Sequence, residues 1–337
     1  QNDKALLARE LARSKQFKFR KIFDFLSVIF TFDFLSLTLL GFLLAIMYMT
    51  NAWDGIIYFG LSGLVFLYIF YHNRKPYTVN RIQETVIQTT KYLILLLLLF
   101  VVFSLPFQLH FKPFVFGIGV VKDHSPLWML AILWGFFYFC VTGFIVMLIR
   151  RKKWTGELDK SEVFILLIIL ISTGLLIFPE LFYVKDIYPL HYRANTMFKL
   201  GYQAFIMLSL ASGYIIARTF ANKTNKTNLT YKTYKIFLIF LLFLVSLYPY
   251  FSVNSYFGGL KTYKGLYGLS YLEKLYPSDY QAILWLQNNV HGQPVILEAV
   301  GDSYTDYARA SANTGLPTVL GGPGHDWLWR CSFNEAG

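Results

Sequence analysis

The stretch VFILLIILISTGLLIFP, residues 163–179, decides the fold class, because 17 consecutive residues carry no charge. A helix needs roughly 20 apolar residues to cross the hydrocarbon core of a bilayer. Such a helix commonly extends at both ends into aromatic or basic residues that sit at the interface. We therefore predict a membrane-spanning helix here and compare the rest of the chain with it.

Six other apolar runs have the same character, so the chain is predicted to be an all-α polytopic membrane protein with about seven transmembrane helices. The chain is 55% hydrophobic and 15% charged, and its mean hydropathy is +0.46. Soluble domains contain about 25% charged residues. The predicted helices occupy about 27–49, 56–72, 92–107, 127–149, 163–179, 197–217 and 236–252.

Lysine and arginine predict the orientation of these helices. Segments 1–23, 73–91, 150–162 and 218–235 hold 21 of the 31 basic residues, and cytoplasmic loops are enriched in them. We expect a multi-pass protein of the plasma membrane whose N-terminus is cytoplasmic. Basic clusters of this kind orient helices or contact lipid headgroups. The lipid bilayer is therefore the expected partner, and the net charge of +12 does not indicate nucleic acid.

The pattern of apolar runs and basic segments divides the chain into three parts. Residues 1–23 form a basic cytoplasmic segment, residues 24–252 a transmembrane helical domain, and residues 253–337 an extracytoplasmic C-terminal segment. In the last part a helix-start signal at Pro277 and a short apolar run at 294–300 predict a helix and a buried strand. We expect a small, truncated α/β segment there, and we expect the chain to be a fragment of a longer protein.

Polar groups that are not simply basic gather on the predicted outer side. Trp53 and Asp54 lie between the first two helices, where they suit a cation or a sugar hydroxyl, or form a helix cap beside an interfacial Trp. The connection 179–203 is richer, and its cations suit a phosphate; a structural salt-bridge network is the alternative. Its candidate site residues are Glu180, Asp186, Arg193, Asn195, Lys199 and Gln203.

One helical face and one terminal loop add to these candidates. Lys199 and Gln203, with Asn195, follow near-i, i+4 spacing, and polar residues at membrane depth usually face a cavity or a partner. The C-terminal segment combines carboxylates and cations with two Trp rings, a set that can hold a sugar or form a structural loop. Its candidates are Glu298, Arg309, His325, Asp326 and Arg330. Cys140 and Cys331 indicate neither a disulfide framework nor a Cys-based metal site.

The chain resembles the YYY-domain membrane protein family, an uncharacterised prokaryotic family placed near the GT-C-type glycosyltransferases. The pattern departs at Gly322, Asp326 and Cys331, where Trp, Glu and Gly are expected. The matching pieces span nearly the whole chain in order. They are NAWD at 51–54, LPFQLHFKPF at 105–114, ELFYVKD with RANTMFK within 180–199, AILWLQ at 282–287, PVILEAVGDSY at 294–304 and TGLPTVLGGPGHDWLWR at 314–330.

The resemblance implies a GT-C-like glycosyltransferase that moves a sugar from a polyprenyl-phosphate donor to an extracytoplasmic acceptor. In this interpretation Asp54, Glu180 and Asp186 bind a divalent metal such as Mg²⁺ or Mn²⁺, or one of them acts as the base. Arg193 and Lys199 hold the donor phosphate, and the C-terminal segment helps to bind the acceptor. In GT-C enzymes the first outer loop usually supplies the catalytic carboxylate, which would then lie upstream of Gln1.

A non-catalytic transporter or a scaffold for envelope assembly is the alternative, so the sequence leaves enzymatic activity open. Transporters often carry internal repeats and broken helices near the bilayer midplane. The chain shows no internal repeat, and its polar groups gather at the outer mouth. These features favour an enzyme.

Overall fold

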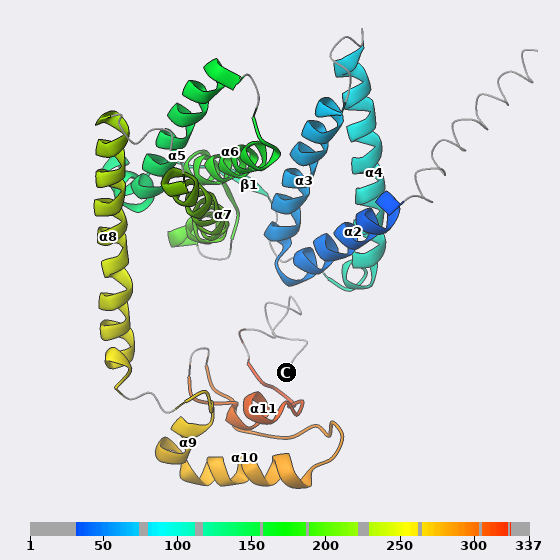
Figure 1. Ribbon diagram of the computed structural model, residues 1–337. Helices are drawn as coiled ribbons and strands as arrows, with labels where there is room; N and C mark the ends of the chain where they lie inside the picture. The colour runs from blue at the N-terminus through cyan, green and yellow to red at the C-terminus, as the bar shows by residue number, and fades with distance from the viewer. Residues whose placement is uncertain are drawn as a thin grey trace, which may run out of the picture. The chain divides into compact units, whose positions relative to one another are not determined.

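The computed structural model describes residues 32–73, 80–111, 117–155, 158–186, 189–221, 229–261, 265–302, 305–322 and 324, and these are mostly helical (Figure 1). The elements in chain order are α2 (Phe32–Thr50), α3 (Ala52–His72), α4 (Arg81–Gln108), β1 (Ile118–Val120), α5 (Leu127–Thr155), α6 (Lys160–Leu181), β2 (Phe182–Val184), η1 (Pro189–His191), α7 (Ala194–Ala221), α8 (Leu229–Phe257), η2 (Gly258–Leu260), α9 (Ser270–Leu275), α10 (Pro277–Asn289) and α11 (Arg309–Thr314).

The helices α3 to α8 are each long and apolar enough to cross a membrane, and α2 contains a shorter apolar stretch, Phe34–Thr50. Each of the seven predicted runs overlaps one of the helices α2 to α8. The fold is that of an all-α polytopic membrane protein, as the sequence predicts. The helix α4 begins at Arg81 rather than near 92, because hydropathy marks where a helix enters the bilayer and not where its backbone hydrogen bonds begin.

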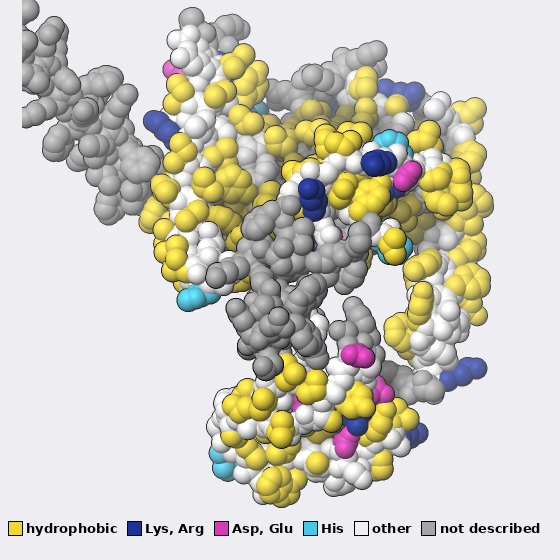
Figure 2. Space-filling view, turned by 180° about the vertical axis from the view of Figure 1, so that it is seen from behind, with side chains coloured by type: hydrophobic (Ala, Val, Ile, Leu, Met, Phe, Trp, Pro, Cys, Tyr) yellow, Lys and Arg dark blue, Asp and Glu magenta, His cyan; other side chains and the backbone are white. Residues whose placement is uncertain are grey.

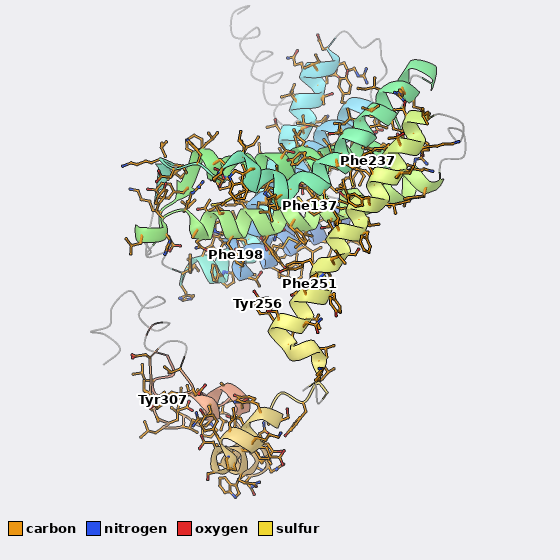
Figure 3. The ribbon with its side chains drawn as sticks, turned by 90° about the vertical axis from the view of Figure 1, so that its left-hand side faces the viewer. Phe137, Phe198, Phe237, Phe251, Tyr256 and Tyr307 are labelled. Carbon is orange, nitrogen blue, oxygen red and sulfur yellow. The ribbon has the colours of Figure 1, made fainter. Side chains whose placement is uncertain are left out.

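Apolar side chains cover much of the surface that Figure 2 shows. The helix α8 is the extreme case, since Leu238 is its buried residue among those that the structure describes. Phe237, Phe251 and Tyr256 project from it along its length (Figure 3) and are more than half exposed. A helix that is apolar all round matches a lipid environment rather than water. This surface is therefore what the bilayer would cover.

The chain packs as two compact units, each described by itself. Unit 1 comprises the described parts of Gln1–His110, Leu148–Leu181 and Ala194–Tyr214. Unit 2 comprises the described parts of Phe111–Met147, Phe182–Arg193 and Ile215–Gly337.

In unit 1 the helices α2, α3 and α4 lie side by side (Figure 1). Leu37 and Leu44 of α2 pack with Leu95 and Leu96 of α4 to form a buried cluster. The two helices approach closely at Gly41, where an added Cβ would lie 2.7 Å from the Cβ of Leu99. Small residues of this kind let membrane helices pack backbone to backbone.

A buried ion pair joins the end of α5 to the start of α6 in unit 1. The side chain of Glu162 is fully buried, and its two carboxylate oxygens accept hydrogen bonds from Nη1 and Nη2 of Arg151, the first at 2.7 Å. The backbone N–H of Asp159 donates to the same carboxylate at 3.0 Å. A buried carboxylate is tolerated because charge and hydrogen bonds together offset its desolvation.

In unit 2 the strands β1 and β2 form an antiparallel ladder in which Gly119 pairs with Tyr183. A side chain at position 119 would collide with the Tyr183 ring, so a larger residue here would require that ring to move. Tyr183 packs on Tyr192, with ring centroids 4.6 Å apart. The Tyr192 hydroxyl oxygen accepts hydrogen bonds from the backbone of Lys122 and Asp123. The α4–α5 and α6–α7 connections thus form one paired structure, which requires both to lie on the same side of a bilayer.

The C-terminal part of unit 2 has a small core of its own. Leu272 of α9 and Ile283 of α10 are fully buried, and Leu316 is nearly so. The helix α10 begins at Pro277, where the sequence predicts a helix start. Within the predicted strand 294–300, Ile296 forms a single parallel bridge with Thr318. One bridge gives too few ladder hydrogen bonds for a regular strand, so helices dominate the described part of this segment.

Candidate functional site

A group of polar side chains from two helices of unit 1 surrounds Asp54, in the first turn of α3. Asn51 is the residue before the helix, and its Nδ2 donates to Oδ1 of Asp54 at 3.0 Å. The sequence allows Asp54 to be a simple helix cap. The Asn51 side chain makes no capping bond to the backbone and instead binds the Asp54 carboxylate. This carboxylate lies at the N-terminal end of α3, where the positive end of the helix dipole favours negative charge.

Gln203 of α7 completes this group from 149 residues away in sequence. Its Nε2 donates to Oδ1 of Asp54 at 2.8 Å, and its Oε1 accepts a bond of 3.1 Å from the Tyr58 hydroxyl. Gln203 is 7% exposed. A carboxylate can only accept a hydrogen bond, so the atom of Gln203 that faces Asp54 must be the donating Nε2. Its Oε1 then faces the Tyr58 hydroxyl, and this defines the orientation of the amide. We call Asn51, Asp54, Tyr58 and Gln203 the Asp54 cluster.

Two oxygen atoms of the Asp54 cluster accept no hydrogen bond from a described side chain. Both side-chain bonds to Asp54 end on Oδ1, and no described side chain donates to its Oδ2. The Oδ1 of Asn51 is buried and has no hydrogen-bond partner among the described residues. A buried acceptor without a partner is rare and costly in proteins. The cluster therefore offers two acceptors to a group that donates hydrogen bonds.

One face of α7 leads from the start of the helix towards this cluster. Asn195 is exposed, Lys199 is half-buried and Gln203 is buried, each four residues from the next. Spacing of four residues puts side chains above one another on a helix. Lys199 forms no ion pair with any described residue. A cation therefore lies one helical turn from the amide that binds Asp54.

The other candidates that the sequence places on the predicted outer side are distributed over both units. Trp53, beside Asp54, and Glu180, in the last turn of α6, are half-buried in unit 1. Asp186 and Arg193 belong to unit 2, where Nη2 of Arg193 donates to Oγ of Ser125 at 3.3 Å. Direct bonding among the predicted site residues is thus found for Asp54 with Gln203. Roles for the others stay predictions.

A metal centre built from Asp54, Glu180 and Asp186 stays a prediction, because Asp54 and Glu180 belong to unit 1 and Asp186 to unit 2. The part of the chain that the structure describes contains no group of three His, Cys, Asp or Glu side chains placed to hold a metal ion. The acceptor pair of the Asp54 cluster consists of one carboxylate and one amide oxygen. We therefore derive no chemical step through a metal.

Two C-terminal candidates have partners within their own segment. The carboxylate of Glu298 accepts hydrogen bonds from the backbone N–H groups of Ala310 and Ser311, at the start of α11. Arg309 pairs with Asp279 of α10 and lies over the Tyr276 ring, 3.7 Å from its centroid. The Arg309 contacts hold α11 against α10, and those of Glu298 hold α11 to the segment that follows α10. His325, Asp326 and Arg330 lie outside the described residues.

Sequence reasoning did not single out Tyr58 or Asn51. Both carried a local signal, since Tyr58 follows Asp54 by four residues on α3 and Asn51 precedes it by three. Those spacings place side chains on one helical face. What the sequence could not give was the contact between Asp54 and Gln203.

The architecture and the buried polar cluster together define a polytopic helical membrane protein. The chain belongs to the family described as uncharacterized membrane protein (DUF2298), whose profile matches residues 8–171 and 149–208. No curated protein and no solved structure matches the chain significantly. Asp54, Lys199 and Gln203 all fall within the matched part.

Proposed function

We propose that the protein is a glycosyltransferase that uses a polyprenyl-phosphate-linked sugar at the extracytoplasmic face of the plasma membrane. The reaction class comes from the resemblance to the YYY-domain family and, through it, to GT-C enzymes. The observation that carries the proposal is the binding of Asp54 through one carboxylate oxygen by Gln203 and Asn51. The second oxygen is left for an acceptor hydroxyl.

In the proposed step Asp54 is the general base. Its Oδ2 accepts the proton of the acceptor hydroxyl while the hydroxyl oxygen bonds to the anomeric carbon of the sugar. The bond between that carbon and the phosphate oxygen breaks, and polyprenyl phosphate leaves with the bonding electrons. A positioned general base typically contributes 10²- to 10⁴-fold to a rate. The free Oδ1 of Asn51 would accept a second hydroxyl of the same acceptor.

Lys199 is the proposed partner of the donor phosphate. It lies one turn from Gln203 on the same face of α7, and no described carboxylate neutralises it. A cation in a partly dehydrated site stabilises the charge that develops on a leaving phosphate. Arg193 and the remaining predicted residues are further candidates for donor and acceptor binding.

The test is transfer of a labelled sugar from a polyprenyl-phosphate donor by the full-length protein in lipid nanodiscs. We expect Asp54→Asn to reduce the rate by about 10²-fold or more. The control is Asp123→Asn, because Asp123 is an exposed carboxylate on a predicted outer connection and its backbone, not its side chain, binds Tyr192. Equal rates for Asp54→Asn and the control would overturn the assignment of the base. Absence of transfer from every such donor would favour the transporter or scaffold hypothesis.

A further inference from the structure

An apolar groove lies in unit 1 at the end of the helices opposite to the Asp54 cluster. It encloses about 400 Å³ and is formed by three helices, with Leu67 and Tyr71 from α3, Ile82 and Val86 from α4, and Val163 from α6 among its walls. Thr85 is buried in it, and its hydroxyl is occupied by the carbonyl of Arg81. The groove thus offers almost no polar atom to an occupant. Its volume lies within the range of small-molecule sites.

Arg81 places a cation at the rim of the groove. The Arg81 guanidinium stacks on the Tyr71 ring, 3.9 Å from its centroid, and donates through Nε and Nη2 to the Tyr71 carbonyl. These contacts hold Arg81 beside the groove and leave Nη1 without a described partner. His72 stacks on Tyr68, another wall residue, with ring centroids 5.5 Å apart. The exposed Lys160 begins α6 three residues before Val163.

The carboxylates of Asp159 and Glu162, near the start of α6, are engaged by Arg151. Glu162 is fully buried in its pair with Arg151, and Asp159 lies 3.4 Å from the same guanidinium. Arg81 forms no ion pair with any described residue, although Glu84 follows it by three residues on α4. An occupant with an apolar chain and a negative head would therefore match the groove and its rim.

We propose that this groove binds an anionic phospholipid, with one acyl chain against α3, α4 and α6 and the phosphate at Nη1 of Arg81. Charge complementarity selects this occupant. A second copy of the chain would bring its own basic segments to the same rim, since they predominate at this end of the helices. Basic pockets between membrane helices on the cytoplasmic side are known sites for anionic headgroups. The proposal does not depend on the proposed function.

The test is lipid retention by the purified full-length protein, measured by native mass spectrometry. Delipidated protein in detergent is mixed with phosphatidylglycerol, with phosphatidylcholine of the same chain length, or with a polyprenyl phosphate. We expect phosphatidylglycerol to be retained preferentially as one bound molecule. Arg81→Gln should weaken its binding about fivefold, the effect of one basic residue at a membrane surface. Val86→Trp should fill the groove and abolish the preference.

Two matched controls separate the site from general lipid contact. Lys232→Gln removes an exposed cation from a predicted cytoplasmic segment, and Val102→Trp enlarges an exposed residue of the same helix as Val86. Both should retain phosphatidylglycerol as the unaltered protein does. Equal loss in Arg81→Gln and Lys232→Gln would overturn the proposal. So would equal retention of phosphatidylcholine, preferential retention of polyprenyl phosphate, or a dimer that Val86→Trp disrupts. Thermal unfolding identifies a variant that fails to fold, and Val86→Leu then replaces Val86→Trp with a smaller expected loss.

Discussion

Arg151 at the end of α5 holds the fully buried carboxylate of Glu162 at the start of α6 through both of its terminal nitrogens. Removing one partner of a buried pair typically costs about 3–5 kcal/mol, because the other charge loses its compensation. The Arg151 side chain is 29% exposed, so water would relieve part of this cost. We expect Glu162→Ala to destabilise the folded protein by about 2 kcal/mol, measured as a fall in the thermal unfolding temperature in detergent.

Asp159 provides the comparison for this pair. It also contacts Arg151, but its side chain is 58% exposed, and exposed pairs contribute about 0–1 kcal/mol. Asp159→Asn should therefore leave the unfolding temperature nearly unchanged. If the two substitutions lowered it equally, burial of Glu162 would not be the source of the stability.

The Gln203→Leu variant should show whether Gln203 positions the Asp54 carboxylate or binds the substrate. The substitution leaves Oδ1 of Asp54 without its α7 donor and the Tyr58 hydroxyl without its acceptor. We expect kcat for sugar transfer to fall about 10- to 100-fold while KM for the donor stays nearly constant, because an interaction that acts in the transition state is lost. Tyr202→Leu is the control, since Tyr202 is the adjacent residue of α7 and is 58% exposed. A rise in KM with unchanged kcat would assign Gln203 to substrate binding.

Single cysteines test the predicted orientation of the chain. In a background with Cys140 and Cys331 replaced by Ser, we would place cysteine at the exposed positions Asn195, Lys232 and Gln293. A membrane-impermeant maleimide added to intact cells should label positions 195 and 293 and leave 232 unlabelled until the cells are opened. Labelling of 195 and 293 from opposite sides would remove the shared outer face on which the transferase proposal depends.

Tyr276 gives a prediction about pH in the C-terminal segment. Its hydroxyl donates a hydrogen bond to the Asp306 carboxylate, which raises the pKa of Tyr276 above its usual value of 10.0. A raised folded-state pKa contributes stability that is present below pH 10 and is lost as the pH rises through the folded pKa. The ultraviolet titration of the unaltered protein minus that of Tyr276→Phe should show one phenol ionising above pH 10. Asp306→Asn should return it towards 10, and an unchanged midpoint would show that the bond does not form.

The membrane helices could be predicted because each apolar run is long and nearly free of charge. The run 163–179 lies wholly within α6. Helix ends were less predictable, as α4 shows, because polar residues can continue the helix beyond the bilayer. The C-terminal run 294–300 has the composition of a strand, yet regular pairing needs a neighbouring segment that bonds along its length. Thr318 provides a single bridge.

The candidate site could be predicted only in part. The i, i+4 spacing of Lys199 and Gln203 identified one face of α7, and Asp54 stood out as an acidic residue at the end of a helix. The contact between Asp54 and Gln203 depends on the tertiary fold, because no local pattern relates residues 149 positions apart. Glu298 and Arg309 show the converse. Their charge suggested binding, which stays a prediction, and the structure adds backbone and carboxylate partners that hold a six-residue helix in place.

The ladder between β1 and β2 bears on how the chain is assembled. β1 is synthesised two membrane helices earlier than its partner, so its edge cannot be covered until α5 and α6 have both been threaded through the bilayer. Until then it presents unpaired main-chain groups of the kind that other chains can capture. Closure of this ladder therefore requires that α5 and α6 have both been inserted.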